Sequence, residues 1–394
     1  MHLEFTPEQQ RLRQEIRGYY RELFTPELRA ALDAEWEELG GPVFREVVGR
    51  MGKDGWLGIG WPREYGGQGR TPLEQFIFWD ETYRARAPLP IIAVNTIGPT
   101  LMQFGTPEQK AELLPGIVKG DLFFGVGYTE PGAGTDLASL STRAVRDGDE
   151  YVIDGQKSYT THAHDADWIW LAARTDPDAP KHKGISILLV PTSAKGFSWT
   201  PIRTLGGERT NVTYYSGVRV PVTNRVGPEN MGWTLITSQL NHERITLAAP
   251  GSADGMLDAV WGWAEKTASP EGGRMLDQPW VQMNLARAYA KLEALKVLNW
   301  RSAWSITAGV PNMAEASGVK VFGTETCIEI YRLLLEITDA AGLVRAGEPG
   351  ALFGGLLEQA YRSAVTLTFG GGVNEVQRDI IAMAGLGLPR AQRR

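Results

Sequence analysis

The spacing of apolar residues predicts helices over the first 120 residues. Between Leu12 and Leu23, apolar side chains recur every three or four positions, which is the period of a helix with one buried face. The run Thr6–Gln9 precedes this stripe and supplies a hydroxyl N-cap, a proline at the first helical position and a glutamine three residues after the cap. The run Thr106–Gln109 has the same four residues and precedes a second stripe. Residues 1–120 therefore indicate an N-terminal helical domain.

Between residues 121 and 227 the pattern changes to short runs rich in β-branched and aromatic residues. Asp-Gly pairs at 147–148 and 154–155 supply turn signals between these runs. The pattern predicts a small antiparallel β-domain over residues 121–227. Its expected strands lie in the runs 122–126, 151–153, 168–173, 184–190 and 214–222.

After residue 228 the helical period returns. Apolar residues such as Leu285, Leu292 and Leu295 recur at helical spacing over long segments. These stripes are typical of a bundle, and we expect a C-terminal four-helix bundle over residues 228–394. Because several of these helices are apolar on more than one face, part of their surface is expected to pack against other subunits. The chain is thus predicted to be an α+β protein of several domains, mainly helical.

The bulk composition excludes several function classes. A net charge of −6 without a Lys/Arg cluster argues against nucleic-acid binding. No apolar run approaches the roughly 18 residues of a membrane span, and the N-terminus lacks the pattern of a signal peptide. The single cysteine, Cys327, fits a reducing compartment. We therefore expect a cytoplasmic protein.

The most distinctive local pattern is Gly127–Asp136, which follows the first predicted strand. Its three glycines and Pro131 exclude continued helix or regular strand. What remains is a loop of exposed backbone N–H groups with the hydroxyls of Thr129 and Thr135, a combination that suits the polar edge of a flat, electron-rich ligand. Taken alone, the stretch also fits a plain tight turn between strands.

A second stretch, Asp154–Thr161, has the sequence Asp-Gly-Gln-Lys-Ser-Tyr-Thr-Thr. Together the two stretches resemble the flavin-binding signatures of the acyl-CoA dehydrogenase family, T-E-P-G-A-G-S-D and N-G-x-K-x-W-I-T. The resemblance extends along essentially the whole chain. It implies a helical domain, a central β-barrel and a helical bundle, with FAD as cofactor and an acyl-CoA thioester as substrate. The cofactor-binding residues that it implies are Tyr128, Thr129, Gly134, Thr135, Tyr159 (in place of the usual tryptophan) and Thr161.

Desaturating a thioester requires a carboxylate base, a hydride acceptor and donors to the thioester oxygen. In the usual family pattern, Y-E-G-T-x-x-x-Q-R, the base position falls here on Gly371, which has no carboxylate. Glu375 lies four residues further on and is better explained as a helix-start carboxylate. A minority of the family instead carries the base in an E-R pair on a helix after the β-domain, and Glu243-Arg244 resembles that pair. The resemblance thus implies Glu243 as base, Arg244 as an orienting residue and the Gly371 N–H as a donor. Without the resemblance, Glu243 is best interpreted as an ordinary helix residue that forms an ion pair with a basic neighbour.

Two departures from the family pattern point to a different partner chain. Residues 271–280 lack the R-x-x-F-G segment that reaches a neighbour's FAD, and residues 336–342 replace the Q-x-x-G-G-x-G loop that does the same. Val373 also replaces a threonine near the ADP portion. This pattern is similar to the α-chains of actinobacterial two-subunit acyl-CoA dehydrogenases that act on steroid side-chain CoA thioesters. It implies an α2β2 assembly with a distinct β-chain, and an electron-transfer flavoprotein or similar acceptor.

Two other functions are compatible with the sequence. A non-catalytic chain that braces an active partner is compatible with Gly371 and the two lost loops. An acyl-CoA oxidase differs in the access of oxygen to the flavin, which the sequence does not reveal. His162 and His164 lie in a polar turn, but two imidazoles without a third placed ligand are weak support for a metal. We expect no metal site.

Overall fold

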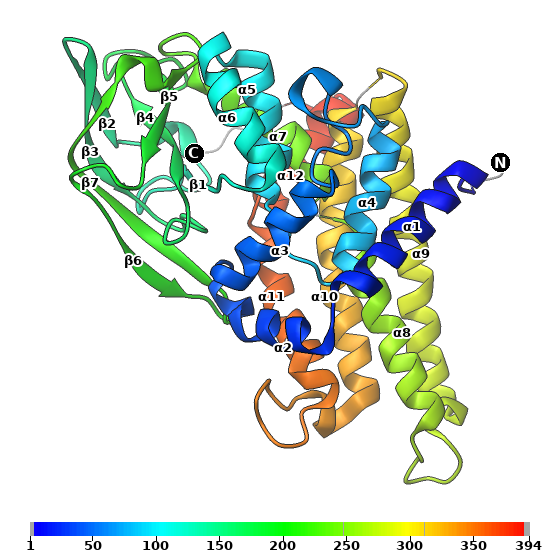
Figure 1. The fold of residues 1–394 in the computed structure, drawn as a ribbon. Coiled ribbons are helices and arrows are strands. Elements are labelled where there is room, and N and C mark those ends of the chain that lie inside the picture. Colours follow the sequence, from blue (N-terminus) through cyan, green and yellow to red (C-terminus); the bar gives the residue numbers. More distant parts are fainter. Residues whose placement is uncertain (1–3, 247, 311, 390–394) are drawn as a thin grey trace.

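The computed structural model describes residues 4–246, 248–310 and 312–389, without the side chains of residues 240–247. Figure 1 shows the strands gathered on one side of the molecule and the long C-terminal helices on the other. The predicted order of helices, strands and helices is confirmed. The N-terminal helices are α1 (Pro7–Leu23), α2 (Pro26–Glu35), α3 (Pro42–Lys53), α4 (Pro72–Arg84), α5 (Gly98–Phe104) and α6 (Pro107–Lys119), with a π-helical segment at Ile92–Ile97.

The N-terminal helices begin where local chemistry predicts. Thr6 caps α1 and Thr106 caps α6, each in a reciprocal capping box with the glutamine three residues on. Both predicted starts are therefore confirmed. Thr71 forms a third capping box at α4, with Glu74. These caps satisfy backbone N–H groups that a helix start otherwise leaves without partners.

The central sheet has the order β6-β7-β3-β2-β4-β5-β8, and β1 pairs with β4 beside this path. Most pairs are antiparallel as predicted, but β1 and β2 each pair with β4 in parallel. Strand β1 follows α6 and extends along β4 in the same direction, whereas β2 meets β4 only at the pair Arg143 and Arg174. The strands are β1 (Phe124–Gly127), β2 (Arg143–Asp147), β3 (Glu150–Lys157), β4 (Trp168–Arg174), β5 (Ile185–Pro191), β6 (Phe197–Arg203), β7 (Arg209–Pro221) and β8 (Arg225–Val226).

The hairpin of β6 and β7 reaches both helical parts of the chain. On one side, Arg209 forms an ion pair with Glu38 in the N-terminal part, with 2.8 Å between Nη1 and Oε2. On the other, the turn between the strands meets α11, where the Arg362 guanidinium donates to the Leu205 carbonyl at 2.5 Å. A single hairpin therefore touches all three parts of the protein.

The C-terminal part is a bundle in which α9 and α10 are the longest helices. The predicted apolar stripes are buried there, including Leu285, Leu292 and Leu295 on α9 and Leu334 on α10. None of the helices in the described ranges is long and apolar enough to cross a membrane. The helices are α7 (Gly232–Thr246), α8 (Gly251–Lys266), α9 (Pro279–Thr307), α10 (Met313–Gly342), α11 (Leu356–Ala364) and α12 (Asn374–Ile380).

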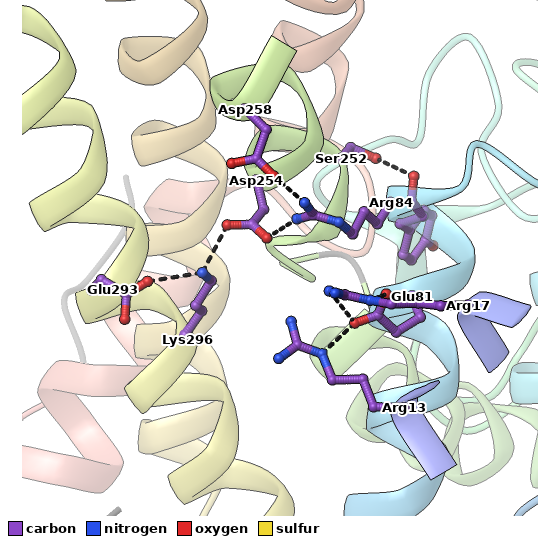
Figure 2. A network of polar contacts seen from close by, with 10 residues as sticks. Arg13, Arg17, Glu81, Arg84, Ser252, Asp254, Asp258, Glu293 and Lys296 are labelled. Atoms are coloured by element: carbon purple, nitrogen blue, oxygen red, sulfur yellow. Dashed lines mark hydrogen bonds and ion pairs between the residues drawn. The ribbon is translucent and has the colours of Figure 1, made fainter. Parts of the chain in front are cut away.

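A polar network joins the N-terminal helices to this bundle (Figure 2). Arg84 on α4 pairs with both Asp254 and Asp258 on α8. Lys296 on α9 lies 2.7 Å from the other oxygen of Asp254. Within the N-terminal part, Glu81 on α4 is almost fully buried and accepts hydrogen bonds from two arginines of α1. The network fixes α4 between α1, α8 and α9.

Candidate flavin and substrate site

The two signature stretches lie side by side at one end of the sheet. The first continues from β1, and the second begins in β3 and continues past its end at Lys157. They are joined directly, because the Ser158 N–H donates to the Thr129 carbonyl at 2.8 Å. Residues about 30 positions apart in sequence thus form one continuous surface.

A buried ion pair lies beneath this surface. Lys157 is 0% exposed, and its Nζ donates to Glu130 Oε1 at 2.8 Å and to the Tyr128 carbonyl at 3.1 Å. Burial lowers the pKa of the Lys157 amine to about 8, while the Glu130 carboxylate opposes the shift. The contact between Lys157 and Glu130 thus forms a buried ion pair, and Lys157 links the second signature to the first.

Glu130 also closes the loop that carries the first signature. Its oxygens accept from the Ser141 N–H at 2.7 Å, the Ser141 hydroxyl at 2.8 Å and the Thr142 N–H at 2.8 Å. Burial acts to raise the pKa of Glu130, but the Lys157 charge and these hydrogen bonds hold it at about 2. The carboxylate is therefore a structural anchor for the loop rather than an acid or base.

Strand β7 supports the second signature through hydrogen bonds to Thr160 and Thr161. The Thr160 N–H donates to the Asn211 carbonyl at 2.8 Å, and Asn211 Nδ2 donates back to the Thr160 carbonyl at 3.1 Å. The Thr161 hydroxyl lies 3.2 Å from that of Thr210, and the Thr160 hydroxyl lies 3.2 Å from that of Thr213. Sequence reasoning missed these β7 residues. The available signal was three polar residues within the first five positions of a strand whose later residues alternate between buried and exposed.

The side of the two stretches that faces away from the buried ion pair is open to solvent. Thr135 is exposed, and the Tyr159 ring is 63% exposed. A Cβ built on Gly132 would meet no atom within 4 Å, and one on Gly134 would meet only a methyl group of Thr129 at 3.9 Å. An aromatic ring, a hydroxyl and glycine backbone are thus left accessible above a rigid base. This set of groups fits a flat ring system with a polar edge.

The Tyr128 side chain has a different role from its neighbours. Its hydroxyl accepts from Trp170 Nε1 of β4 at 3.1 Å and hydrogen-bonds to Gln239 Oε1 of α7. The side chain therefore connects the β-domain to the helix that carries the predicted base. Its predicted contact with the cofactor stays a prediction.

The predicted catalytic residues lie on two C-terminal elements. Glu243 and Arg244 belong to α7, but their side chains lie outside the described residues. Gly371 is half-buried in the loop before α12, and its φ of +64° favours glycine. Glu375 is exposed in the first turn of α12, as expected for a helix-start carboxylate. The roles predicted for Glu243, Arg244 and Gly371 therefore stay predictions.

A buried lysine that the sequence analysis missed supports the Gly371 loop. Lys320 of α10 is fully buried, and its Nζ donates to the carbonyls of Thr368 at 3.1 Å and Gly372 at 2.8 Å. It also donates to Asn374 Oδ1 at 2.7 Å. The ammonium thus holds both ends of the loop at the position where the family usually carries its base.

The two histidines near the second signature, His162 and His164, each form a hydrogen bond within the protein. The His162 ring bonds the Leu39 carbonyl, and burial lowers the pKa of its imidazole to about 4. His164 Nδ1 lies 3.1 Å from Asn211 Nδ2, and burial also lowers its pKa. In the part of the chain that the structure describes, no three potential metal ligands gather.

The structure also describes the two stretches that depart from the family pattern. Residues 271–280 form an exposed turn and the short helix Met275–Asp277 before α9 begins. Residues 336–342 are the end of α10, where Asp339 has a positive φ of 46°. The first stretch lacks the R-x-x-F-G segment, and the second is the end of a helix where the resemblance has the Q-x-x-G-G-x-G loop.

The domain order, the paired signatures and the open face above them define a member of the acyl-CoA dehydrogenase family, and the chain belongs to that flavin-dependent family. Models of the family's N-terminal, middle and C-terminal domains match residues 6–121, 125–217 and 230–386. The resemblance inferred from the two signatures is therefore confirmed.

Individual relatives are similar over their full length. The acyl-CoA dehydrogenase FadE26 of Mycobacterium tuberculosis is 54% identical over 401 residues, covering 100% of both chains. The ChsE4-ChsE5 complex from Mycobacterium tuberculosis contains a chain with a TM-score of 0.93 and 54% identity, covering 99% of this chain and 100% of that one. A chain of the Tcur3481-Tcur3483 steroid acyl-CoA dehydrogenase gives a TM-score of 0.94 at 54% identity, with coverages of 99% and 100%.

Proposed function

We propose that this chain is the catalytic α-chain of a cytoplasmic, FAD-dependent acyl-CoA dehydrogenase that desaturates a steroid side-chain CoA thioester. The observation that carries the proposal is the rigid double signature, in which the Glu130–Lys157 pair lies beneath an open face bearing Thr135 and Tyr159. The solved relatives add the substrate class, since one is named a steroid acyl-CoA dehydrogenase at 54% identity.

The roles of the residues follow from the needs of the reaction. Glu243 takes the α-proton of the thioester, and Arg244 orients that carboxylate or the substrate. The Gly371 N–H donates to the thioester oxygen as enolate-like charge develops. Thr135 and Thr161 hold the polar edge of the isoalloxazine, with Thr129, Gly134 and Tyr128 along the same loop and Tyr159 against the ring. FAD, when bound, would supply the acceptor for the β-hydride, and the proposed partner for its electrons is an electron-transfer flavoprotein or similar acceptor.

The proposed assembly is an α2β2 tetramer with a distinct β-chain. The support is the absence of the family's usual sequence at residues 271–280 and 336–342, segments that serve a neighbour's FAD in the resemblance. The pyrophosphate of FAD is anionic, and without donors from a neighbour its desolvation goes uncompensated. The relative named as the ChsE4-ChsE5 complex has two different chains, which fits a partner that restores those donors.

The test is co-expression with a candidate β-chain, followed by flavin content, sedimentation mass and activity on a panel of CoA thioesters. In that complex, Glu243→Gln is expected to keep its FAD and to lose about 10²–10⁴-fold in rate, because the general base is gone. Glu375→Gln is the matched control and is expected to keep the wild-type rate. A Glu243→Gln enzyme that retains half the rate would place the base elsewhere.

The same preparation separates the competing functions. A complex that binds no flavin on this chain's signatures would favour a bracing, non-catalytic chain. Rapid reoxidation of the reduced flavin by oxygen would favour an oxidase. A stable homotetramer with one FAD per subunit and full activity would refute the need for a β-chain.

A further inference from the structure

Gln239 on α7 is a buried side chain that, among the described residues, is hydrogen-bonded at only one of its two ends. It is 1% exposed, and its Oε1 bonds the Tyr128 hydroxyl. Its Nε2 has no hydrogen-bond partner among the residues that the structure describes. Buried polar groups in native proteins are nearly always paired, so this amide needs an explanation.

The hydrogen bonds of Tyr128 agree with the amide orientation that turns the oxygen of Gln239 towards it. Trp170 Nε1 can only donate, so the Tyr128 hydroxyl oxygen accepts from it at 3.1 Å. The Tyr128 proton is then directed to an acceptor, and Gln239 Oε1 takes it. The end without a partner is therefore the NH2 group, which offers donors and no acceptor. Whatever completes this site must bring an acceptor atom.

The position of Gln239 indicates what that acceptor belongs to. Gln239 lies one helical turn before Glu243 on α7, and it contacts the first predicted flavin-binding residue, Tyr128. Helix α7 packs against α10, β5, α5 and the π-helical segment Ile92–Ile97, which places it where the β-domain meets both helical parts. The free donor is thus enclosed at the junction where the proposed function places both cofactor and acyl group.

We propose that Gln239 contacts the bound ligand, with its side-chain amide donating a hydrogen bond to a carbonyl oxygen. The inference rests on the proposed function. Two ligands can supply this oxygen: the isoalloxazine ring and the acyl thioester. The Trp170–Tyr128–Gln239 chain then serves to aim the donor, since each member fixes the orientation of the next.

The test uses the flavin-loaded complex with its partner chain. Gln239→Glu keeps an oxygen for the Tyr128 proton and removes the amide donors. Thr237→Glu is the matched control, because it adds the same charge to an exposed position of α7. Gln239→Met, which has no donor and no charge, carries the test if the glutamate variant does not assemble.

Two binding measurements distinguish the sources of the oxygen. The dissociation constant and absorbance of FAD are measured without substrate, and then the dissociation constants of an enoyl-CoA product and of a thioether analogue that lacks the carbonyl oxygen. A flavin acceptor predicts that FAD binding weakens about 5–10-fold with a spectral shift. A thioester acceptor predicts that only the enoyl-CoA weakens by that factor.

The inference is overturned if FAD and enoyl-CoA constants of both Gln239 variants lie within twofold of the Thr237→Glu control. It is also overturned if thioester and thioether weaken equally while FAD is unaffected, because the donor would then serve packing or a bound water. If the wild-type complex binds neither FAD nor thioester, the proposed function and this inference fall together.

Discussion

Replacing Lys157 with methionine should destabilise the protein strongly, because Lys157 is the buried counter-charge of Glu130. The methionine fills a similar volume, so the main change is the loss of the 2.8 Å contact to the carboxylate and the 3.1 Å contact to the Tyr128 carbonyl. Breaking a buried ion pair from one side typically costs about 3–5 kcal/mol. Glu130 keeps three hydrogen bonds from Ser141 and Thr142, so we expect a value near the lower end, about 3 kcal/mol.

The assay is urea unfolding of the assembled protein, with midpoints compared at equal slope. Lys195→Met at an exposed position is the control and should change the free energy of unfolding by less than about 0.5 kcal/mol. The double variant Glu130→Gln/Lys157→Met removes both charges, and it should be more stable than Lys157→Met alone. Because the pair joins the two signatures, Lys157→Met should also release flavin more readily than the control.

Two results would refute this reasoning. A Lys157→Met protein less than about 1 kcal/mol below wild type would show that the carboxylate does not depend on its counter-charge. A double variant less stable than the single one would show that the hydrogen bonds of Glu130, rather than its charge balance, dominate.

Two further predictions concern the joint between α4 and α8. A Cβ on Gly251 would lie 2.0 Å from the Asp80 carbonyl oxygen, so Gly251→Ala should lower the free energy of unfolding by about 1–3 kcal/mol in a denaturant experiment. A Cβ on Gly262 of the same helix would meet no atom within 4 Å, so Gly262→Ala should raise the free energy of unfolding by up to about 1 kcal/mol. Equal effects at the two glycines would contradict the close approach. Burial, with Glu81 and Asp254 nearby, raises the pKa of Asp80 to about 7 from an ordinary 3.8. The folded state therefore holds a proton that the unfolded chain releases, and stability falls as pH rises between about 4 and 7. Relative to Asp80→Asn, the wild-type free energy of unfolding should fall by up to about 1.4 kcal/mol per pH unit there; parallel pH profiles would rule this out.

Local chemistry predicted the parts of the fold that depend on near neighbours. The starts of α1 and α6 follow from four adjacent residues each, and the buried stripes of α9 follow from a regular repeat. Strand β6 was missed because most of its side chains are exposed, so it has no apolar run. The parallel placement of β1 was missed because pairing direction depends on where the chain enters the sheet.

The candidate site shows the same division. The two signatures are contiguous motifs, and the sequence alone was sufficient to locate them. Their supports are distant in sequence: Asn211 holds Thr160 from 51 positions away, and Lys320 holds the carbonyl of Gly372 from 52 positions away. Contacts between residues so far apart produce no repeating pattern in the sequence. The sequence shows only a polar residue in a strand or helix where apolar residues are expected, and it does not show which partner that residue binds.

The hairpin of β6 and β7 limits how this enzyme can admit its substrate. The strand that holds the second signature also ends in contacts with Glu38 on one side and, through the turn, with Arg362 on the other. A hinge motion that separated the β-domain from either helical part would have to break these contacts and shift the strand that supports the second signature. Entry is therefore expected through side-chain and loop adjustments within a fixed frame. The frame around the two signatures is then ordered during folding, before any thioester arrives, so binding does not have to supply that ordering cost.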